Sequence, residues 1–382
     1  MRVELPEPTP EERAHCERVA ALIRNEIAAA GDSIDFARYM ELALYAPGLG
    51  YYSAGAAKFG AAGDFITAPE LGCVFARCFA RAIAPVLRET QGDILELGPG
   101  SGALAAELLL ELERFDVLPA RYRLLERSAD LRARQRETIA ARCAHLAARC
   151  EWLDAPPGDS WRGALVANEV IDALPVRAFV LRDKGLFARQ VGVDENKNFV
   201  WREVEADAPM VDAVRAAVTG SGPPSPALTA LPRPYFSEVC VMLPPWLAEV
   251  TRTLRQGSAW FIDYGYADGA YYAPARREGT LRCHWRHRAH NDPLILPGLQ
   301  DITAWVDFDA LARAGAQVGF AVEAHATQAQ FLIAHGLDEV FARTYADAPD
   351  EAARYALAQE VKRLTLPNEM GERFRVMVLR TS

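Results

Sequence analysis

The sequence has no apolar run of membrane-spanning length and no Cys-x-x-Cys pair. A transmembrane helix needs about 20 consecutive apolar residues, so we expect no membrane insertion. The seven cysteines are an odd number and are scattered along the chain. This pattern indicates reduced thiols in a cytoplasmic setting, because a disulfide framework shows an even set of cysteines at close spacing.

A net positive charge is also lacking, because 51 acidic residues outnumber 42 basic ones and the formal net charge is −9. That balance argues against a protein whose whole surface binds nucleic acid and leaves room only for a local basic patch. The first residues, MRVELPEPTPEER, lack the apolar core of a signal peptide and are too acidic for a transit peptide. We therefore expect neither kind of targeting segment.

The rest of the composition is that of an ordinary globular protein, with 382 residues of which 51% are hydrophobic and 24% charged. Thr9, Pro10 and Glu12 predict a helix with a capping box, and Gly31 ends it. Residues 32–45 read as a second helix. A long loop rich in glycine and aromatic residues follows at 45–72, and loops of this length are often functional.

From residue 92 onward, strand-like and helix-like segments alternate. DILEL, RYRLLER, CEWLD and GALVANEV are strand-like, and the first three are separated by two amphipathic, helix-like segments. This alternation predicts a parallel sheet with helices on its faces. Residues 178–206 break the rhythm and read as antiparallel strands. Two insertions are expected, near 177–240 and 265–300.

The segment GDILELGPGSGALAAELL, residues 92–109, joins a predicted strand to a predicted helix. Gly98, Gly100 and Gly102 leave the backbone bare where a ligand would cross the carboxyl end of the strand. A pyrophosphate favours the spacing G-x-G-x-x-G, whereas here alternate glycines follow Glu96. A carboxylate at that point suits a cationic ligand such as S-adenosyl-L-methionine. The pattern resembles motif I of class I methyltransferases, which use that cofactor.

Two later acids fit the same ligand. Glu126 ends the second strand, where a carboxylate would accept both ribose hydroxyls, although a dinucleotide enzyme would place an acid similarly. Asp154 ends the third strand, where class I methyltransferases often place an acid on the adenine amino group. Either one could be a plain surface acid. In this order after Glu96, they favour the S-adenosylmethionine interpretation.

NEVIDALPV follows the fourth strand and contains three candidate catalytic residues, Asn168, Glu169 and Asp172. Acids rarely stay buried without a partner, so these side chains are expected to face the methyl acceptor. Methyl transfer depends on positioning and needs no metal. Two carboxylates could also hold a guanidinium, although the motif alone does not establish an arginine acceptor. Asp172 could instead cap a helix.

Several stretches together carry a family resemblance that covers most of the chain. They are FARYMELALYAPGLGYYS, FGAAGDFITAPELGCVF, ILELGPGSGAL, LLERSADLRARQ, NEVIDALPV, FIDYG, TLRCHWRHRAHNDPL, PGLQDITAWVDF and TQAQFLIAHGL. In this order they resemble the MidA-type methyltransferase family. Its mitochondrial members assist respiratory complex I assembly by symmetric dimethylation of an arginine on a complex subunit.

The resemblance implies an α/β fold of the class I (Rossmann-like) methyltransferase type, with a mostly parallel seven-stranded sheet. Residues 1–90 would form a helical extension and a loop that covers the cofactor, and residues 91–382 the core with its insertions. The substrate would be a protein, a subunit of a respiratory complex. Residues implied at the cofactor are Asp64, Phe65, Thr67, Pro69, Glu96, Gly98, Pro99, Gly100, Gly102, Glu126 and Asp154. Ser101 and Ala103 depart from the Arg and Thr of many relatives.

The stretch TLRCHWRHRAH has Cys283, His284, His287 and His290 at a spacing that matches no common zinc pattern, so no metal site is predicted. The arginines of residues 276–290 could dock an acidic partner or a nucleic acid, or could form a solvated edge. His284 or His290 could accept a proton near the acceptor. Asp263 and Tyr264, after the fifth strand, are further site candidates.

Three rival functions remain open at this point. The first is a methyltransferase for nucleic acid or a small molecule, although the chain has N-E-V-I where base amino-methylases present N-P-P-Y. The second is an assembly factor that keeps the fold without catalysis. The third is a nicotinamide-dependent oxidoreductase.

Overall fold

The computed structural model describes residues 5–53, 67–219 and 228–381. Its largest sheet, here called the core sheet, runs in the order β15–β16–β10–β5–β2–β3–β4. Neighbouring strands from β10 to β4 are parallel, and β16 is antiparallel to both its neighbours. This confirms the predicted class I fold with its mostly parallel seven-stranded sheet; a short strand, β14 (Val306–Asp307), also pairs with β10. The strands are β2 Asp93–Leu97, β3 Tyr122–Leu125, β4 Cys150–Leu153, β5 Trp161–Asn168, β10 Leu254–Tyr266, β15 Phe320–Thr327 and β16 Phe374–Thr381.

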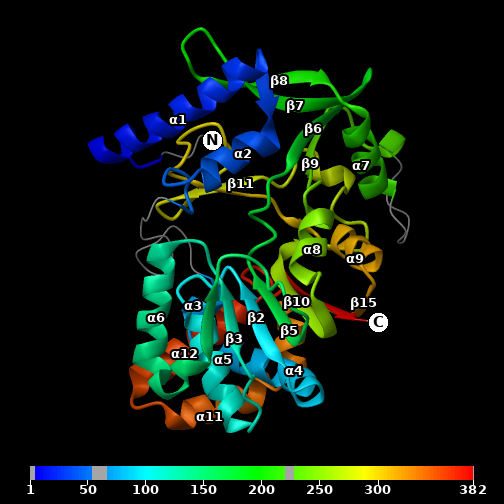
Figure 1. The fold of residues 1–382 in the computed structure, drawn as a ribbon. Coiled ribbons are helices and arrows are strands. Elements are labelled where there is room, and N and C mark those ends of the chain that lie inside the picture. The colour runs from blue at the N-terminus through cyan, green and yellow to red at the C-terminus, as the bar shows by residue number, and fades with distance from the viewer. Residues whose placement is uncertain (1–4, 54–66, 220–227, 382) are drawn as a thin grey trace.

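The core sheet is buried because helices cover both of its faces (Figure 1). Ile94 of β2 packs into one hydrophobic cluster, and Leu95 and Leu97 pack into the cluster on the opposite face. All five residues of β2 are buried, as expected of a parallel strand with helices on either side. The covering helices are α4 Val74–Thr90, α5 Ala103–Arg114, α6 Ala129–Cys143, α8 Leu243–Thr251, α9 Phe308–Gln317, α10 Gln328–Ala334, α11 Leu337–Asp347 and α12 Glu351–Thr365.

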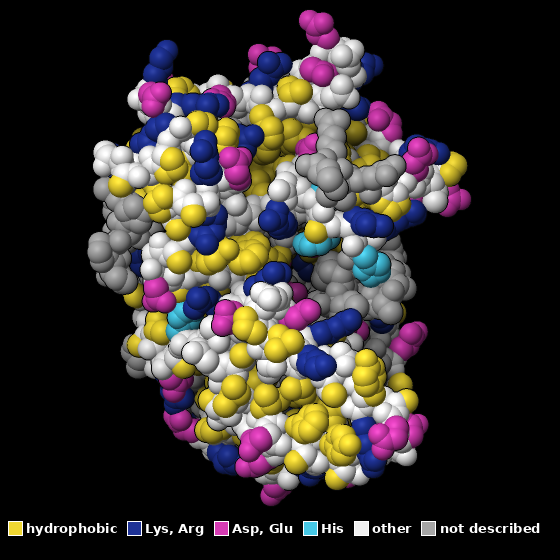
Figure 2. Space-filling model, turned by 180° about the vertical axis from the view of Figure 1, so that it is seen from behind, with side chains coloured by type: hydrophobic (Ala, Val, Ile, Leu, Met, Phe, Trp, Pro, Cys, Tyr) yellow, Lys and Arg dark blue, Asp and Glu magenta, His cyan; other side chains and the backbone are white. Residues whose placement is uncertain are grey.

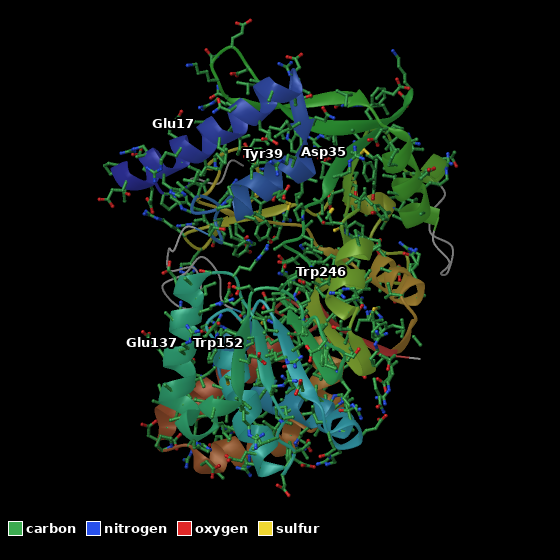
Figure 3. The ribbon with its side chains drawn as sticks, viewed as in Figure 1. Glu17, Asp35, Tyr39, Glu137, Trp152 and Trp246 are labelled. Carbon is green, nitrogen blue, oxygen red and sulfur yellow. The ribbon has the colours of Figure 1, made fainter. Side chains whose placement is uncertain are left out.

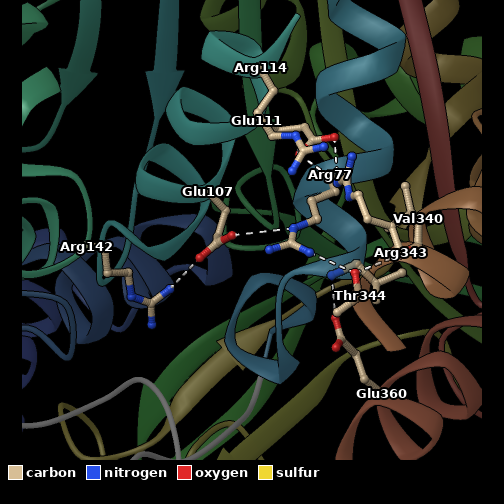
Figure 4. Close-up of polar contacts among 10 residues, drawn as sticks. Arg77, Glu107, Glu111, Arg114, Arg142, Val340, Arg343, Thr344 and Glu360 are labelled. Atoms are coloured by element: carbon tan, nitrogen blue, oxygen red, sulfur yellow. Dashed lines mark hydrogen bonds and ion pairs between the residues drawn. The ribbon is translucent and has the colours of Figure 1, made fainter. Parts of the chain in front are cut away.

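Polar contacts join the helices on one face of the core sheet (Figure 4). Two oxygens of Glu111 on α5 each accept from Nη2 of Arg343 on α11 at 2.7 Å. Glu360 of α12 accepts from the backbone N–H of Val74 at 2.7 Å and so caps the start of α4. Burial raises the pKa of Glu360 to about 7. These contacts hold the start of α4 in place. The short helix α3, Ala68–Leu71, lies just before α4 and lines a large cavity.

Helix α1, Pro10–Ala30, begins with the predicted capping box between Thr9 and Glu12. The prediction of a helix over 32–45 is wrong at its start. Ser33–Asp35 form strand β1, which pairs with β7 of a second sheet, and the helix α2 covers only Phe36–Tyr45. The Asp35 side chain accepts from the backbone N–H of Ala37 at 2.9 Å, so it caps α2 rather than lying inside it.

The second sheet has the order β1–β7–β6–β9, with β8 on the other side of β7, and helix α7 beside it. Its strands β6, β7 and β8 confirm the antiparallel interpretation of residues 178–206. A third sheet, β12–β11–β13, comes from the later insertion. We call these two sheets with α1, α2 and α7 the cap, and it lies over one end of the core sheet (Figure 1). The bounds are β6 Arg177–Arg182, β7 Gly185–Val193, β8 Phe199–Glu205, β9 Tyr235–Val239, α7 Ala208–Thr219, β11 Arg282–Trp285, β12 Arg288–His290 and β13 Asp301–Thr303.

Candidate active site

A cavity of about 1390 Å³ lies between the carboxyl ends of the core-sheet strands and the cap. Small-molecule pockets usually measure about 300–1,000 Å³, so this one has room for two ligands side by side. Trp246 of α8 borders it between the two parts of the molecule (Figure 3). On the back of the molecule, basic and histidine side chains gather at the same level (Figure 2). The position agrees with the rule that open α/β sheets bind ligands beyond their carboxyl ends.

The glycine turn after β2 forms part of the cavity floor. Gly98, Gly100 and Gly102 have φ angles of 58°, 54° and 82°, which L side chains rarely adopt. A Cβ on Gly100 would meet nothing within 4 Å, so this backbone is open toward the cavity that it lines. Gly98 and Pro99 line the cavity as well, whereas Gly102 begins α5 without lining it.

Glu96 lies beneath this turn and is buried while still lining the cavity. Its carboxyl group accepts a hydrogen bond from the Tyr122 hydroxyl at 2.7 Å. Burial raises the pKa of Glu96 to about 7. A cation next to this group would favour its charged form, which is the electrostatic match expected from the sequence. Tyr122 as its partner was not predicted.

Glu126 reaches the cavity from the end of β3. Its carboxylate accepts from the backbone N–H of Ser128 at 2.8 Å and from Nε2 of Gln135 at 3.4 Å. The same Gln135 amide donates to the carbonyl of Gly100 at 2.9 Å and accepts from Trp152 Nε1 at 2.8 Å. Gln135 is fully buried and joins the glycine turn to Glu126. Sequence reasoning missed this role, and a polar residue on the buried face of α6 was its only local signal.

The structure does not bring every predicted cofactor residue to the cavity. Thr67 and Pro69 line it, but Asp64 and Phe65 lie outside the described residues. Asp154 is not among the lining residues: its side chain is 84% exposed and contacts Arg132 at 2.5 Å. The turn that follows β4 therefore carries this carboxylate away from the cavity toward solvent.

The three candidate catalytic residues meet at another side of the same cavity. The Glu169 backbone has a φ of 53°, and its N–H donates to the carbonyl of Ile262 at 2.8 Å. This turn directs the chain away from β5 as soon as the strand ends. Asn168 Nδ2 donates to Glu169 Oε1 at 3.3 Å. Burial, and next the charge of Asp172, raise the pKa of Glu169 to about 8.

Asp263 and Tyr264 of β10 hold the segment that carries Asp172. One oxygen of the buried Asp263 accepts from the backbone N–H groups of Ile171 at 3.1 Å and of Asp172 at 3.2 Å. The Tyr264 hydroxyl donates to Asp172 Oδ2 and lines the cavity. Asp172 Oδ1 has no hydrogen-bond partner among the described residues. Asp172 thus faces the site with one oxygen fixed and the other available.

The cap supplies a wall that sequence reasoning did not predict. Tyr45 and Tyr52 stack with ring centroids 5.5 Å apart, and both line the cavity. Asp301 of β13 also lines it, is 2% exposed, and accepts from the Tyr52 hydroxyl at 2.8 Å. PGLQDITAWVDF contained this aspartate, but no spacing rule singled it out.

Basic side chains of the stretch 276–290 form contacts within the protein itself. Arg276 donates to the carbonyl of Tyr271 at 3.0 Å, and Arg286 Nη2 lies 2.8 Å from both oxygens of Glu12. His284 lines the cavity, whereas His290 is buried elsewhere, and burial lowers its pKa. Within the described part of the chain, no group of three or more His, Cys, Asp or Glu side chains is placed to hold a metal ion.

No helix within residues 5–53, 67–219 and 228–381 combines the length and the apolar character that crossing a membrane requires. All seven cysteines are free thiols.

The strand order, the bare turn after β2 and the acids at the neighbouring strand ends define a class I methyltransferase. The chain belongs to the family of S-adenosyl-L-methionine-dependent methyltransferases, whose family model matches residues 76–326. It is therefore an enzyme of this class, and its cofactor is S-adenosyl-L-methionine. These findings confirm the family resemblance, enzyme class and cofactor predicted from the sequence.

Individual relatives support the assignment. The mouse protein arginine methyltransferase NDUFAF7, mitochondrial, is 29% identical over 379 residues, which cover 91% of this chain and 80% of that protein. A COG1565 superfamily member from Burkholderia thailandensis, solved bound to S-adenosyl-homocysteine, superposes with a TM-score of 0.90 at 41% identity and covers 99% of this chain and 95% of that one. A second crystal structure from that species has a TM-score of 0.88 at 39% identity, with the same coverage of both chains.

Proposed function

We propose that this methyltransferase modifies an arginine side chain of a protein. The observation that carries the proposal is the acidic side of the cavity, which Glu169 and Asp172 both line, close enough that the charge of Asp172 raises the pKa of Glu169. Arginine keeps its positive charge at all physiological pH values, and its planar guanidinium suits carboxylate pairs. The mouse relative reported above, a protein arginine methyltransferase, supports the same acceptor.

The cofactor would occupy the side of the cavity floored by the glycine turn. Gly98, Pro99 and Gly100 offer bare backbone there, and Glu126 would accept the ribose hydroxyls. Glu96 would face the positive end of the cofactor. When bound, S-adenosyl-L-methionine supplies a methyl group on a positively charged sulfur. Thr67 and Pro69 would border it, while Asp64, Phe65, Gly102 and Asp154 stay sequence predictions.

The carboxylates of Glu169 and Asp172 would orient the guanidinium so that one nitrogen faces the methyl group. Positive charge then concentrates on the nitrogens that contact the carboxylates, and the reacting nitrogen keeps more of its lone-pair character. Asn168 fixes Glu169, and Tyr264 fixes Asp172. Asp263 acts as a positioning residue because it holds the backbone of Ile171 and Asp172.

The acceptor protein that the family resemblance favours is a subunit of a respiratory complex of the complex I type. The mouse relative is a mitochondrial protein. For this chain we propose action in the cytoplasmic compartment, in keeping with its seven free cysteines.

Mass spectrometry of the respiratory complex subunits, from cells with and without this protein, tests the acceptor. We expect one arginine to carry methyl groups only when the protein is present. Methylation of nucleic acid or of a small molecule alone, in parallel incubations with labelled cofactor, would overturn the proposal. A protein that binds the cofactor but transfers no methyl group to any pool would instead be a non-catalytic assembly factor.

A further inference from the structure

We propose that Asp301, from the inserted third sheet, is a further substrate-binding carboxylate of the acceptor site. It would bind the arginine guanidinium together with Glu169 and Asp172. This inference rests on the proposed arginine acceptor and deepens it. Its consequence is that the cap takes a direct part in choosing the substrate.

Hydrogen bonds place Asp301 firmly relative to the core sheet. Tyr52 donates to Asp301 Oδ1 at 2.8 Å, and Tyr52 stacks on Tyr45 with an angle of 25° between the rings. The Tyr45 hydroxyl donates at 2.8 Å to the carbonyl of Ala173, which directly follows Asp172. One pair of stacked tyrosines therefore connects the cap carboxylate to the segment that carries Asp172.

A second connection runs through the backbone. The N–H of Ala304, just after β13, donates to the carbonyl of Asp172 at 2.9 Å. The third sheet is thus joined directly to the loop after β5. Asp301 and Asp172 lie on segments that are linked twice, so their separation is set by the fold.

Electrostatics point to a cationic occupant. The negative charges of Asp172 and Asp301 both raise the pKa of Glu169, so both carboxylates lie within electrostatic range of Glu169. Buried like charges destabilise one another unless a cation or protons compensate them. Asp172 is 6% exposed, and its Oδ1 has no hydrogen-bond partner within the described residues. A guanidinium offers five N–H donors in one plane, enough to serve several carboxylates together.

The aromatic rings of two tyrosines also suit a guanidinium. Tyr45 and Tyr52 line the cavity beside the carboxylates, and planar cations stack favourably on aromatic rings. Lysine, with its compact ammonium, would gain less from this planar arrangement. The combination selects arginine over lysine and over neutral analogues of arginine.

The test uses the full-length protein loaded with S-adenosyl-homocysteine and an acetylated, amidated Gly-Gly-Arg-Gly-Gly peptide. Dissociation constants come from ligand-observed NMR titration, with the citrulline peptide as the neutral analogue. We expect wild type to prefer the arginine peptide and Asp301→Asn to weaken its binding on the order of tenfold to a hundredfold. Affinity for S-adenosyl-homocysteine should stay unchanged. Asp212→Asn, an exposed acid on α7, is the matched control and should behave as wild type.

The outcomes separate this inference from the proposed function. If loaded wild type does not prefer arginine to citrulline, the arginine acceptor is wrong and Asp301 loses its role with it. If wild type has that preference and Asp301→Asn keeps wild-type affinity for the arginine peptide, only the inference is overturned. Should Asp301→Asn fail to bind S-adenosyl-homocysteine, Tyr52→Phe decides. It removes the hydroxyl that orients Asp301 and should weaken arginine binding severalfold, and unchanged affinity would refute the role of Asp301.

Discussion

The protonation state of Glu169 makes the stability of the fold and the binding of a cation in the site depend on pH. Its folded-state pKa of about 8 lies above the ordinary value of 4.5, chiefly because the group is buried. The ligand-free fold therefore prefers Glu169 protonated. Its contribution to stability is fully present below pH 4.5 and is lost as the pH rises through about 8. The proposed guanidinium substrate needs the charged form, so its binding would displace this proton.

We predict that arginine-peptide binding at neutral pH releases a proton and tightens as the pH rises toward 8. The groups that act on Glu169 are Asp172, Asp301, Asn168 and the backbone N–H of Ala68. Calorimetry in two buffers of different ionisation enthalpy measures the proton. Glu169→Gln should abolish most of the release, and heats that are identical in both buffers for wild type would contradict the assignment.

Helix α6 shows how an element can organise a site through one buried side chain. Gln135 contacts the glycine turn, the end of β3 and Trp152 of β4. Exposed residues of the same helix, such as Glu137, point away from the cavity (Figure 3). The geometry of the cofactor side therefore depends on the packing of α6 as much as on the glycines.

Replacing Gln135 by Leu should leave Trp152 Nε1 and the Gly100 carbonyl without their partner. We predict a loss of about 1–3 kcal/mol in the free energy of unfolding, the usual effect of stranding buried polar groups. Affinity for S-adenosyl-homocysteine should fall about tenfold. Urea unfolding and calorimetry measure both quantities. Glu137→Gln, on the exposed face of the same helix, should change neither, and a wild-type affinity in Gln135→Leu would refute the positioning role.

The helices on one face of the core sheet offer a comparison between a buried and an exposed ion pair. Glu111 is 2% exposed and binds Arg343 of α11 through both oxygens (Figure 4). Glu339 of the same helix α11 pairs with Arg81, but its side chain is 68% exposed. The first pair is shielded from water and the second is not.

We predict that Glu111→Gln lowers the free energy of unfolding by about 1–3 kcal/mol. Glu339→Gln should lower it by less than about 1 kcal/mol, because water already screens that pair. Urea denaturation of both variants provides the measurement, and cofactor affinity should be unchanged in each. Equal losses in the two variants would show that burial does not set the strength of these pairs.

The elements differ in how well the sequence predicts them. The strands around the glycine turn can be predicted from the sequence because each is a short apolar run followed by turn residues. The strands of the core sheet confirm these predictions. Ser33–Asp35 were expected to be helical because a strand of three residues has no periodicity to detect. Its conformation depends on pairing with β7, a partner more than 150 positions away.

The same contrast holds for the candidate site. Asn168, Glu169 and Asp172 lie within five residues of one another, and their shared location is predictable from one motif. Asp301 and Tyr52 reach the cavity only because the cap folds over the sheet, which no local pattern encodes. Asp154 illustrates the reverse case, since its position at a strand end is right but its side chain turns to solvent.

At the scale of the whole molecule, the cavity joins two parts that are held together by contacts far apart in sequence. The N–H of Ala304, after β13 of the cap, donates to the carbonyl of Asp172, after β5 of the core sheet. The Tyr45 hydroxyl donates to the carbonyl of Ala173. The proposed cofactor side belongs to the core sheet, and the cap contributes to the proposed acceptor side. A ligand that fills the cavity should stabilise both parts together.

We predict that S-adenosyl-homocysteine raises the thermal unfolding midpoint in a concentration-dependent way, whereas NAD does not. A ligand at a hundredfold excess over its dissociation constant adds about 2.7 kcal/mol to the folded state. The spacing of the glycine turn and Glu96 beneath it disfavour a pyrophosphate. Differential scanning fluorimetry with either ligand tests this, and stabilisation by NAD would contradict the electrostatic interpretation of the turn.

The proposed arginine acceptor rests on the acidic side of the cavity, where Glu169 and Asp172 lie. The most direct measurement is the chemical identity of the methylated product after incubation of the protein with methyl-labelled cofactor and a cell extract that supplies protein, RNA and DNA. We predict label on the guanidinium nitrogens of arginine after complete hydrolysis of the protein fraction. Label confined to nucleic acid, to small molecules or to other amino acids would contradict the account.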